Sequence, residues 1–131
     1  MTMTNEHPNI SVIKRFDPRN IAGTQNLFSE DVVFHCFNPL LPDLQGDYVG
    51  STAIGTFFEK VGTLTGGSFR IIPVSVTAVG DELVVTHTKN RMKLAGQSIE
   101  TDVVVVWRIV DGRITEVWDI PSVNKVQFGD T

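Results

Sequence analysis

The second half of the chain alternates apolar and polar residues between three turn-forming dipeptides. These are Gly80-Asp81, Ala95-Gly96 and Asp111-Gly112. Each tolerates positive φ and is typical of a two-residue hairpin loop. The runs between them are rich in Val, Ile, Thr and Trp, which favour strands. The pattern predicts an antiparallel meander over residues 69–79, 82–94, 97–110 and 113–120.

The first half of the chain spaces its apolar residues mostly as helices do. The spacing predicts a helix over residues 9–16, and Asp17 before Pro18 is typical of the start of a second helix over 18–28. Ser51 is a suitable N-cap for a third helix, with Gly62 placed to end it.

One strand and one long loop separate the second and third helices. Residues 31–37 alternate, so that Val33, His35 and Phe37 share one face of a strand. The loop over residues 38–49 contains leucines as well as prolines, and such an apolar loop is placed to cap a pocket.

The order helix, helix, strand, helix and four strands predicts an α+β fold. We expect a cone-shaped α+β barrel, in which three N-terminal helices cover a curved, mixed but mainly antiparallel sheet. A length of 131 residues suits a single domain. The polar residues 1–8 are expected to be disordered.

The three turns also fix which residues share a face of the sheet. Counting from each loop sets Val74, His87, Val104 and Asp119 in one row across four strands. The next row is apolar and consists of Val76, Val85, Val106 and Val117. On the other side lie Ile72, Lys89, Asp102 and Pro121, so that Lys89 and Asp102 would form an ion pair at the rim of a pocket. A slip of one residue at any turn would exchange the two faces beyond it.

The same register places Trp107 and Trp118 together on the opposite face. Exposed aromatic residues on a sheet are typical of a subunit interface. We therefore expect a homodimer through the face that bears Trp107 and Trp118.

Composition narrows the range of partners and compartments. Eleven basic and fifteen acidic residues give a net charge of −4, with no basic cluster, which argues against a nucleic-acid or membrane partner. The single cysteine, Cys36, cannot form an internal disulfide. The chain shows neither a secretory signal nor an apolar stretch of membrane-spanning length, so we expect a cytoplasmic protein with a hydrophobic small-molecule ligand.

Asp119 and His87 are the first candidates for chemistry. A carboxyl group in an apolar pocket has a raised pKa, and it can take a proton from carbon and return it. His87 would orient Asp119 or act as a second acid or base. The alternative is structural, with Asp119 capping the strand end or pairing with His87. Two histidines and an aspartate also suit a divalent metal, but their spacing matches no metal motif, so we expect neither metal nor cofactor.

Four short segments resemble the nuclear transport factor 2-like superfamily, and its SnoaL-like polyketide cyclase branch in particular. They are Asp31-Val32-Val33-Phe34-His35, Gly50-Ser51, Asp111-Gly112-Arg113-Ile114 and Glu116-Val117-Trp118-Asp119. The resemblance spans roughly residues 9–123 and implies that the first strand lies beside the last. His35 would then approach Asp119 from the side opposite Val104, and Asp119 would be the acid/base.

The pocket expected from the register and the resemblance together has a specific lining. Its members are Val74, Val85, Val104, Val106, Val117, Phe37 and Phe57. Asp119, His87 and His35 are the expected catalytic residues within it.

The resemblance leaves three functions open. The first is a small cofactor-independent enzyme of the cyclase or isomerase type, acting on a hydrophobic carbonyl-bearing ligand. The second is a non-catalytic small-molecule or protein-binding module, and the third is a hydrolase, like the epoxide hydrolases of this fold, that holds water between Asp119 and Asp102. The ketosteroid isomerases of the family use a tyrosine in the first helix, whereas Tyr48, the single tyrosine, lies in a predicted loop.

Overall fold

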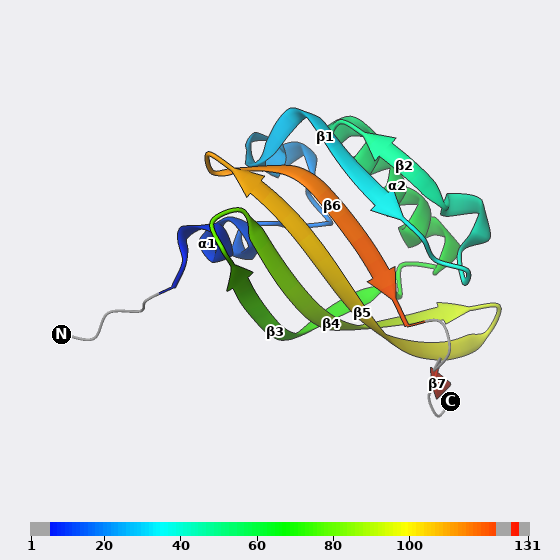
Figure 1. Cartoon of the computed structure of the whole chain (residues 1–131). Coiled ribbons are helices and arrows are strands. Elements are labelled where there is room, and N and C mark those ends of the chain that lie inside the picture. Colours follow the sequence, from blue (N-terminus) through cyan, green and yellow to red (C-terminus); the bar gives the residue numbers. More distant parts are fainter. Residues whose placement is uncertain (1–5, 123–126, 129–131) are drawn as a thin grey trace.

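The computed structural model describes residues 6–122 and the backbone of residues 127–128. In chain order its elements are α1 (Pro8–Lys14), η1 (Ala22–Leu27), β1 (Phe28–Cys36), η2 (Pro42–Leu44), β2 (Gly46–Val49), α2 (Ser51–Leu64), β3 (Arg70–Val79), β4 (Leu83–Leu94), β5 (Gln97–Val110), β6 (Arg113–Pro121) and β7 (Gln127–Phe128) (Figure 1). Residues 1–5, most of the segment expected to be disordered, lie outside the described residues.

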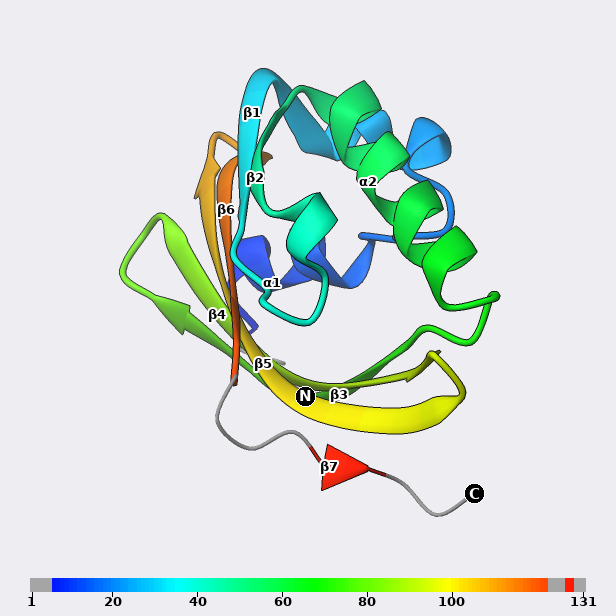
Figure 2. The same cartoon turned by 90° about the vertical axis from the view of Figure 1, so that its right-hand side faces the viewer.

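A single curved sheet forms one wall of the molecule. Its strand order is β2-β1-β6-β5-β4-β3. The short strand β7 pairs with β5 at Ile99 and Glu100, near the start of β5. β1 runs parallel to β6, and the other neighbours are antiparallel. Figure 2 shows the sheet bending around α1 and α2, which lie on its concave side. The predicted α+β class and cone-like arrangement are confirmed, and the first strand, β1, does lie beside β6, the last of the predicted strands.

The helical segments differ in detail from the sequence pattern. α1 begins at Pro8, one residue before the predicted start, with the His7 ring nitrogen accepting a hydrogen bond from the Asn9 amide. The predicted second helix is only the short 3-10 segment η1, and β1 begins directly after it at Phe28. α2 continues past Gly62, because a glycine weakens a helix without ending it when the apolar face continues to pack.

The predicted loop 38–49 contains a strand that the sequence pattern does not reveal. β2 pairs antiparallel with β1, so that His35 lies opposite Asp47. Gly50 then turns the chain into α2 with a φ of +88°, a conformation that favours glycine. The segment has only four residues, and Gly46 and Asp47 at its start are of types that are rare in strands, so the sequence pattern does not reveal it.

The hairpin turns are close to prediction. Ala95 and Gly96 both have positive φ, as do Asp111 and Gly112, which is the geometry of two-residue loops matched to the sheet twist. The third loop differs, because Val79 pairs with Leu83 and leaves three residues in the turn.

Two β-bulges change the register beyond the turns. The first lies between Pro73 and Ser75 on β3. The three-residue turn makes Ser75, and not Val74, pair with His87, and the bulge then restores the predicted pairing of Ile72 with Lys89. The second lies where β5 pairs with β6: Ile109 pairs with Ile114, but Arg108 pairs with Glu116, leaving Thr115 as the extra residue. A bulge of this kind inserts one residue into one strand and shifts every later pair.

The predicted row of four residues is therefore wrong at both ends. His87 does pair with Val104, and Lys89 with Asp102, as predicted. However, Val104 pairs with Ile120, and Asp119 pairs with Val105. Because side chains alternate between faces, Asp119 points to the face opposite His87.

The hydrophobic core lies between α2 and the concave face of the sheet. Ile54, Phe57 and Val61 of α2 are buried there, as are Phe34 of β1 and Trp107 of β5. Each large apolar side chain buried in this way contributes roughly 1.5–3 kcal/mol relative to an exposed one. This packing determines which face of the sheet the helices cover. The site described next lies on that covered, concave face.

Candidate functional site

A cavity of about 1410 Å³ lies between the concave face of the sheet and the helices. α1, η1, α2 and strands β3 to β6 all contribute to its wall. The wall is largely apolar, and its aromatic members are Phe16, Phe28, Phe34, Phe58, Phe69 and Trp107. Phe16 and Trp107 meet edge to face, with ring centroids 5.1 Å apart. A cavity of this size with a mainly apolar surface is typical of a small-molecule site.

Asp119 brings a carboxyl group to this cavity from β6. The bulge at Thr115 turns its side chain inward, where its sheet neighbours are Val105 on β5 and Cys36 on β1. Among the described residues, no hydrogen bond or ion pair involves the Asp119 carboxyl group. Burial raises the pKa of Asp119 to about 7, because the surroundings replace the water that would stabilise its charge.

Cys36 is buried next to Asp119. Burial raises the pKa of the Cys36 thiol to about 12, and the neighbouring Asp119 charge contributes to the rise. The thiol therefore stays protonated near neutral pH. It supplies a small, neutral wall to the carboxyl group and no competing nucleophile.

Polar residues of β4 form a second polar part of the cavity wall. Thr86, Thr88 and Asn90 alternate along the strand and all line the cavity. The Thr86 hydroxyl oxygen accepts a hydrogen bond from the Trp107 indole N–H at 3.0 Å. The Thr88 hydroxyl donates to the Asn90 side-chain oxygen at 2.9 Å.

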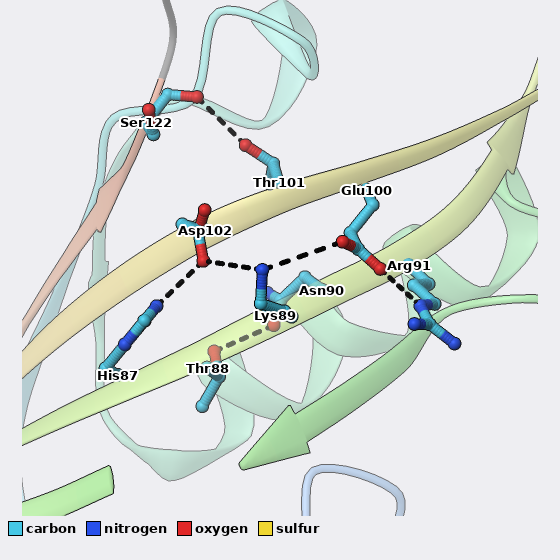
Figure 3. Close-up of polar contacts among 9 residues, drawn as sticks. All are labelled: His87, Thr88, Lys89, Asn90, Arg91, Glu100, Thr101, Asp102 and Ser122. Carbon is cyan, nitrogen blue, oxygen red and sulfur yellow. Dashed lines mark hydrogen bonds and ion pairs between the residues drawn. The ribbon is translucent and has the colours of Figure 1, made fainter. Parts of the chain in front are cut away.

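His87 belongs to the convex face and not to this cavity, so the predicted contact with Asp119 is wrong. Its Nε2 lies 2.8 Å from an Asp102 carboxylate oxygen, and Lys89 Nζ lies 3.5 Å from the same oxygen. Figure 3 shows the contacts continuing from Lys89 to Glu100 and on to Arg91. The hydrogen bond from His87, more than the charge of Lys89, lowers the pKa of Asp102.

The predicted ion pair of Lys89 and Asp102 exists, but not at the rim of the large cavity. Asp102 and His87 instead border a shallow hollow of about 360 Å³ on the convex face, with Val104, Ile120, Pro121 and Ser122. Both partners are half exposed, and exposed pairs of this type add little to stability.

His35 also lies on the convex face, which corrects the expected approach to Asp119. Its ring bridges two carboxylates, with Nδ1 2.7 Å from Asp47 and Nε2 2.6 Å from Glu116. The ring stacks on Trp118, with centroids 5.6 Å apart. Hydrogen bonding to Glu116 is the main cause that raises the pKa of His35. The two histidines and Asp119 therefore do not assemble a metal site.

The expected pocket lining is partly correct. Val74 and Val117 do line the large cavity. Val85, Val104 and Val106 point to the convex face, because they alternate with Thr86 and Val105 along β4 and β5. Phe37 is 61% exposed just beyond the end of β1, and Phe57 is buried behind the cavity wall against Phe34.

The two tryptophans are separated in the same way. Trp107 lines the cavity, whereas Trp118 lies on the convex face beside His35. A homodimer through the sheet stays a prediction. Its interface would be the convex face, which bears Trp118 but not Trp107.

Several cavity residues are not apparent from the sequence pattern. Phe16, Phe58, Thr88 and Asn90 all line the cavity. The pattern places the aromatic residues only in the core, and it assigns the polar residues of β4 to the outer face. Trp107 is the residue of the sequence that could have revealed them. A large apolar side chain in a strand of valines indicates the covered face of the sheet, and Thr88 and Asn90 share that face.

The family assignment agrees with this architecture. The model of the SnoaL-like domain matches residues 11–117, and the chain belongs to that family. No curated protein matches the chain. Among the helices of the described residues, none has the length and apolar character that a membrane span requires.

Solved structures share the fold over most of the chain. TerC, co-crystallised with polyporic acid, is 28% identical, with a TM-score of 0.73 over 88% of this chain and 92% of that one. Bal32a, from a soil-derived mobile gene cassette, is 21% identical, with a TM-score of 0.76 over 88% and 90%. An NTF2-like protein of unknown function from Burkholderia pseudomallei is 23% identical, with a TM-score of 0.75 over 87% and 90%.

Proposed function

We propose that the protein is a cofactor-independent enzyme of the cyclase or isomerase type, with Asp119 as general base on a hydrophobic carbonyl-bearing ligand. The observation that carries this proposal is a buried carboxyl group in the wall of a large, mainly apolar cavity, where burial raises the pKa of Asp119 to about 7. A base is most effective when its pKa lies near the working pH.

The chemistry would be a proton transfer at a carbon next to the carbonyl group. The Asp119 carboxylate takes the proton, the C–H electrons move into the carbonyl to give an enolate, and the protonated carboxyl returns the proton to the same or another carbon. The mainly apolar wall limits the contact of the enolate with water. Neither His35 nor His87 takes part, because both lie on the convex face.

Solvent deuterium exchange tests this proposal without the natural substrate. β-Tetralone is a suitable two-ring ketone, because its C–H between the aromatic ring and the carbonyl is acidic. The protein should accelerate deuterium uptake from D₂O, and Asp119→Asn should lower the catalysed rate by about 100- to 10,000-fold. Mass spectrometry of the recovered ketone measures the exchange.

Asp102→Asn is the matched control, since it removes a carboxylate from the other face of the same sheet. It should retain the exchange rate of the natural protein. An Asp119→Asn variant that exchanges deuterium at the original rate, with the fold intact by circular dichroism, refutes the proposal.

A non-catalytic ligand-binding protein is the second candidate. The size of the cavity favours it, as does the likeness to TerC, which was co-crystallised with polyporic acid. Tight binding of polyporic acid together with no deuterium exchange above the uncatalysed rate would favour this candidate over the enzyme.

The hydrolase candidate loses its geometric basis. Asp119 and Asp102 project from opposite faces of the sheet, so no single water can lie between them. These two carboxylates therefore cannot activate a shared water.

A further inference from the structure

On the central strands β4, β5 and β6, the polar residues of the cavity wall lie at two separated places, and only one of these places is the proposed base. Asp119 lies on β6, and the second group is the polar side chains of β4. Across the sheet, Asp119 pairs with Val105, and Val105 pairs with Thr86. The two polar places are therefore two strands apart, with an apolar residue between them.

Asn90 is the far end of this arrangement. It lies four residues beyond Thr86 on the same face of β4. With strand spacings near 4.8 Å and a rise near 3.4 Å per residue, Asn90 is offset from Asp119 by about 10 Å across the strands and about 14 Å along them. Side chains converge on the concave face of a curved sheet, which shortens the gap to the length of a two- or three-ring molecule.

The hydrogen bonds that Thr86, Thr88 and Asn90 make within the protein determine which of their polar atoms is free to bind a ligand. Thr86 accepts from the Trp107 indole, so its oxygen is engaged by the protein. Thr88 donates to the Asn90 oxygen, which orients that amide (Figure 3). Among the described residues, no hydrogen bond uses the Asn90 side-chain nitrogen. The N–H donors of Asn90 are thus presented by an oriented amide in the cavity wall.

Aromatic side chains elsewhere in the cavity wall suit flat rings. Phe16, Phe58 and Trp107 all line the cavity, and Phe16 contacts both others at 5.1–6.0 Å between centroids. Aromatic walls of this kind pack against the faces and edges of planar ligands.

We propose that the cavity binds a flat, largely apolar ligand with an oxygen at each end, one at Asp119 and the other accepting a hydrogen bond from the Asn90 amide. This inference rests on the proposed ligand site and adds the shape and polarity of the molecule that fills it. Asn90 is a specificity residue in this scheme, and Thr88 positions it.

A pair of matched probes tests the inference. para,para′-Dihydroxybiphenyl has an oxygen at both ends of a flat skeleton, and para-hydroxybiphenyl has only one. Trp107 fluorescence reports binding in a Trp118→Phe background, because the chain has two tryptophans and only Trp107 lines the cavity. The two-oxygen probe should bind about tenfold more tightly, the value of one well-made hydrogen bond.

Asn90→Leu should remove this preference while leaving the affinity for the one-oxygen probe nearly unchanged. Thr88→Val should reduce the preference, since the amide loses the hydroxyl that orients it. Arg91→Gln is the matched control, because Arg91 is the next residue on β4 but belongs to the convex network. It should keep the tenfold preference.

The outcomes separate this inference from the proposed function. Equal affinity for the two probes in the natural sequence, or a preference that survives Asn90→Leu, overturns the role of Asn90 and leaves Asp119 as the base. Failure of both probes to change Trp107 fluorescence overturns the proposed shape of the ligand. Deuterium exchange by Asp119 is measured separately and decides the enzyme proposal.

Discussion

Asp119 is the residue at which function and stability oppose each other. An unfolded chain exposes this carboxyl group with a pKa near 3.8, whereas burial raises the pKa to about 7 in the folded protein. Between these two values the unfolded chain releases the proton and the folded protein keeps it. The free energy of unfolding therefore falls as the pH rises from about 4 to about 7, and the loss persists above that range.

Asp119→Asn should consequently stabilise the protein, and more so at high pH. The two pKa values correspond to at most about 4 kcal/mol, and partial access to solvent reduces this to roughly 2–4 kcal/mol at pH 8. Near pH 4 the difference between variant and natural protein should be close to zero. Urea unfolding at both pH values measures the gain. If Asp119→Asn is no more stable than the natural protein at pH 8, the charged Asp119 carboxylate does not destabilise the folded protein, which contradicts its burial.

At the scale of single elements, the bulge at Thr115 decides which side chains reach the cavity. Hydrophobic alternation, turn dipeptides and strand lengths were sufficient to predict β4, β5, their shared turn and the pairing of His87 with Val104. They could not predict the bulge, because one extra residue leaves the pattern of valines and isoleucines almost unchanged. The strand β2 was also beyond prediction, since its four residues are too few to show a strand pattern and begin with Gly-Asp, which disfavours one.

Deleting Thr115 should therefore be far more harmful than replacing it. Without the extra residue, Asp119 and the buried Val117 would turn outward, and Trp118 and Ile120 would turn into the core. We expect a loss of more than about 3 kcal/mol in the free energy of unfolding, or no folded protein. Thr115→Ala keeps the residue count and should cost less than about 1 kcal/mol. Similar stabilities of the two variants in urea would contradict the role of the bulge.

At the scale of the whole molecule, the order of elements carried most of the information in the sequence. Helices followed by an antiparallel meander were enough to predict an α+β cone and a resemblance to the SnoaL-like branch. The candidate site was only partly predictable, since Asp119, Val74 and Val117 do line the cavity but the expected histidines do not. Which face of the sheet is covered depends on a buried apolar cluster that includes residues of α2, β1, β5 and β6, which lie far apart in the chain.

The convex face leads to a prediction about assembly. Ile120 is 51% and Val104 37% exposed there. Ion pairs that include Asp102 and Glu116 place charges of both signs around them. An apolar centre with a mixed-charge rim can complement a second copy of itself about a two-fold axis. We expect a homodimer, and Ile120→Lys should convert it to a monomer. Light scattering after size exclusion measures the mass, and a monomeric natural protein at high concentration would contradict the interface.

The central claim is that Asp119 is a buried carboxyl group poised to exchange a proton near neutral pH. An NMR titration of carbon-13-labelled aspartate, with Asp119→Asn to assign the resonance, measures it directly. The predicted result is a single carboxyl resonance that titrates near pH 7 and is absent in the variant, while Asp102 titrates below its usual range. An Asp119 resonance that titrates near pH 4, like an exposed carboxyl group, would contradict both the site and the function proposed for it.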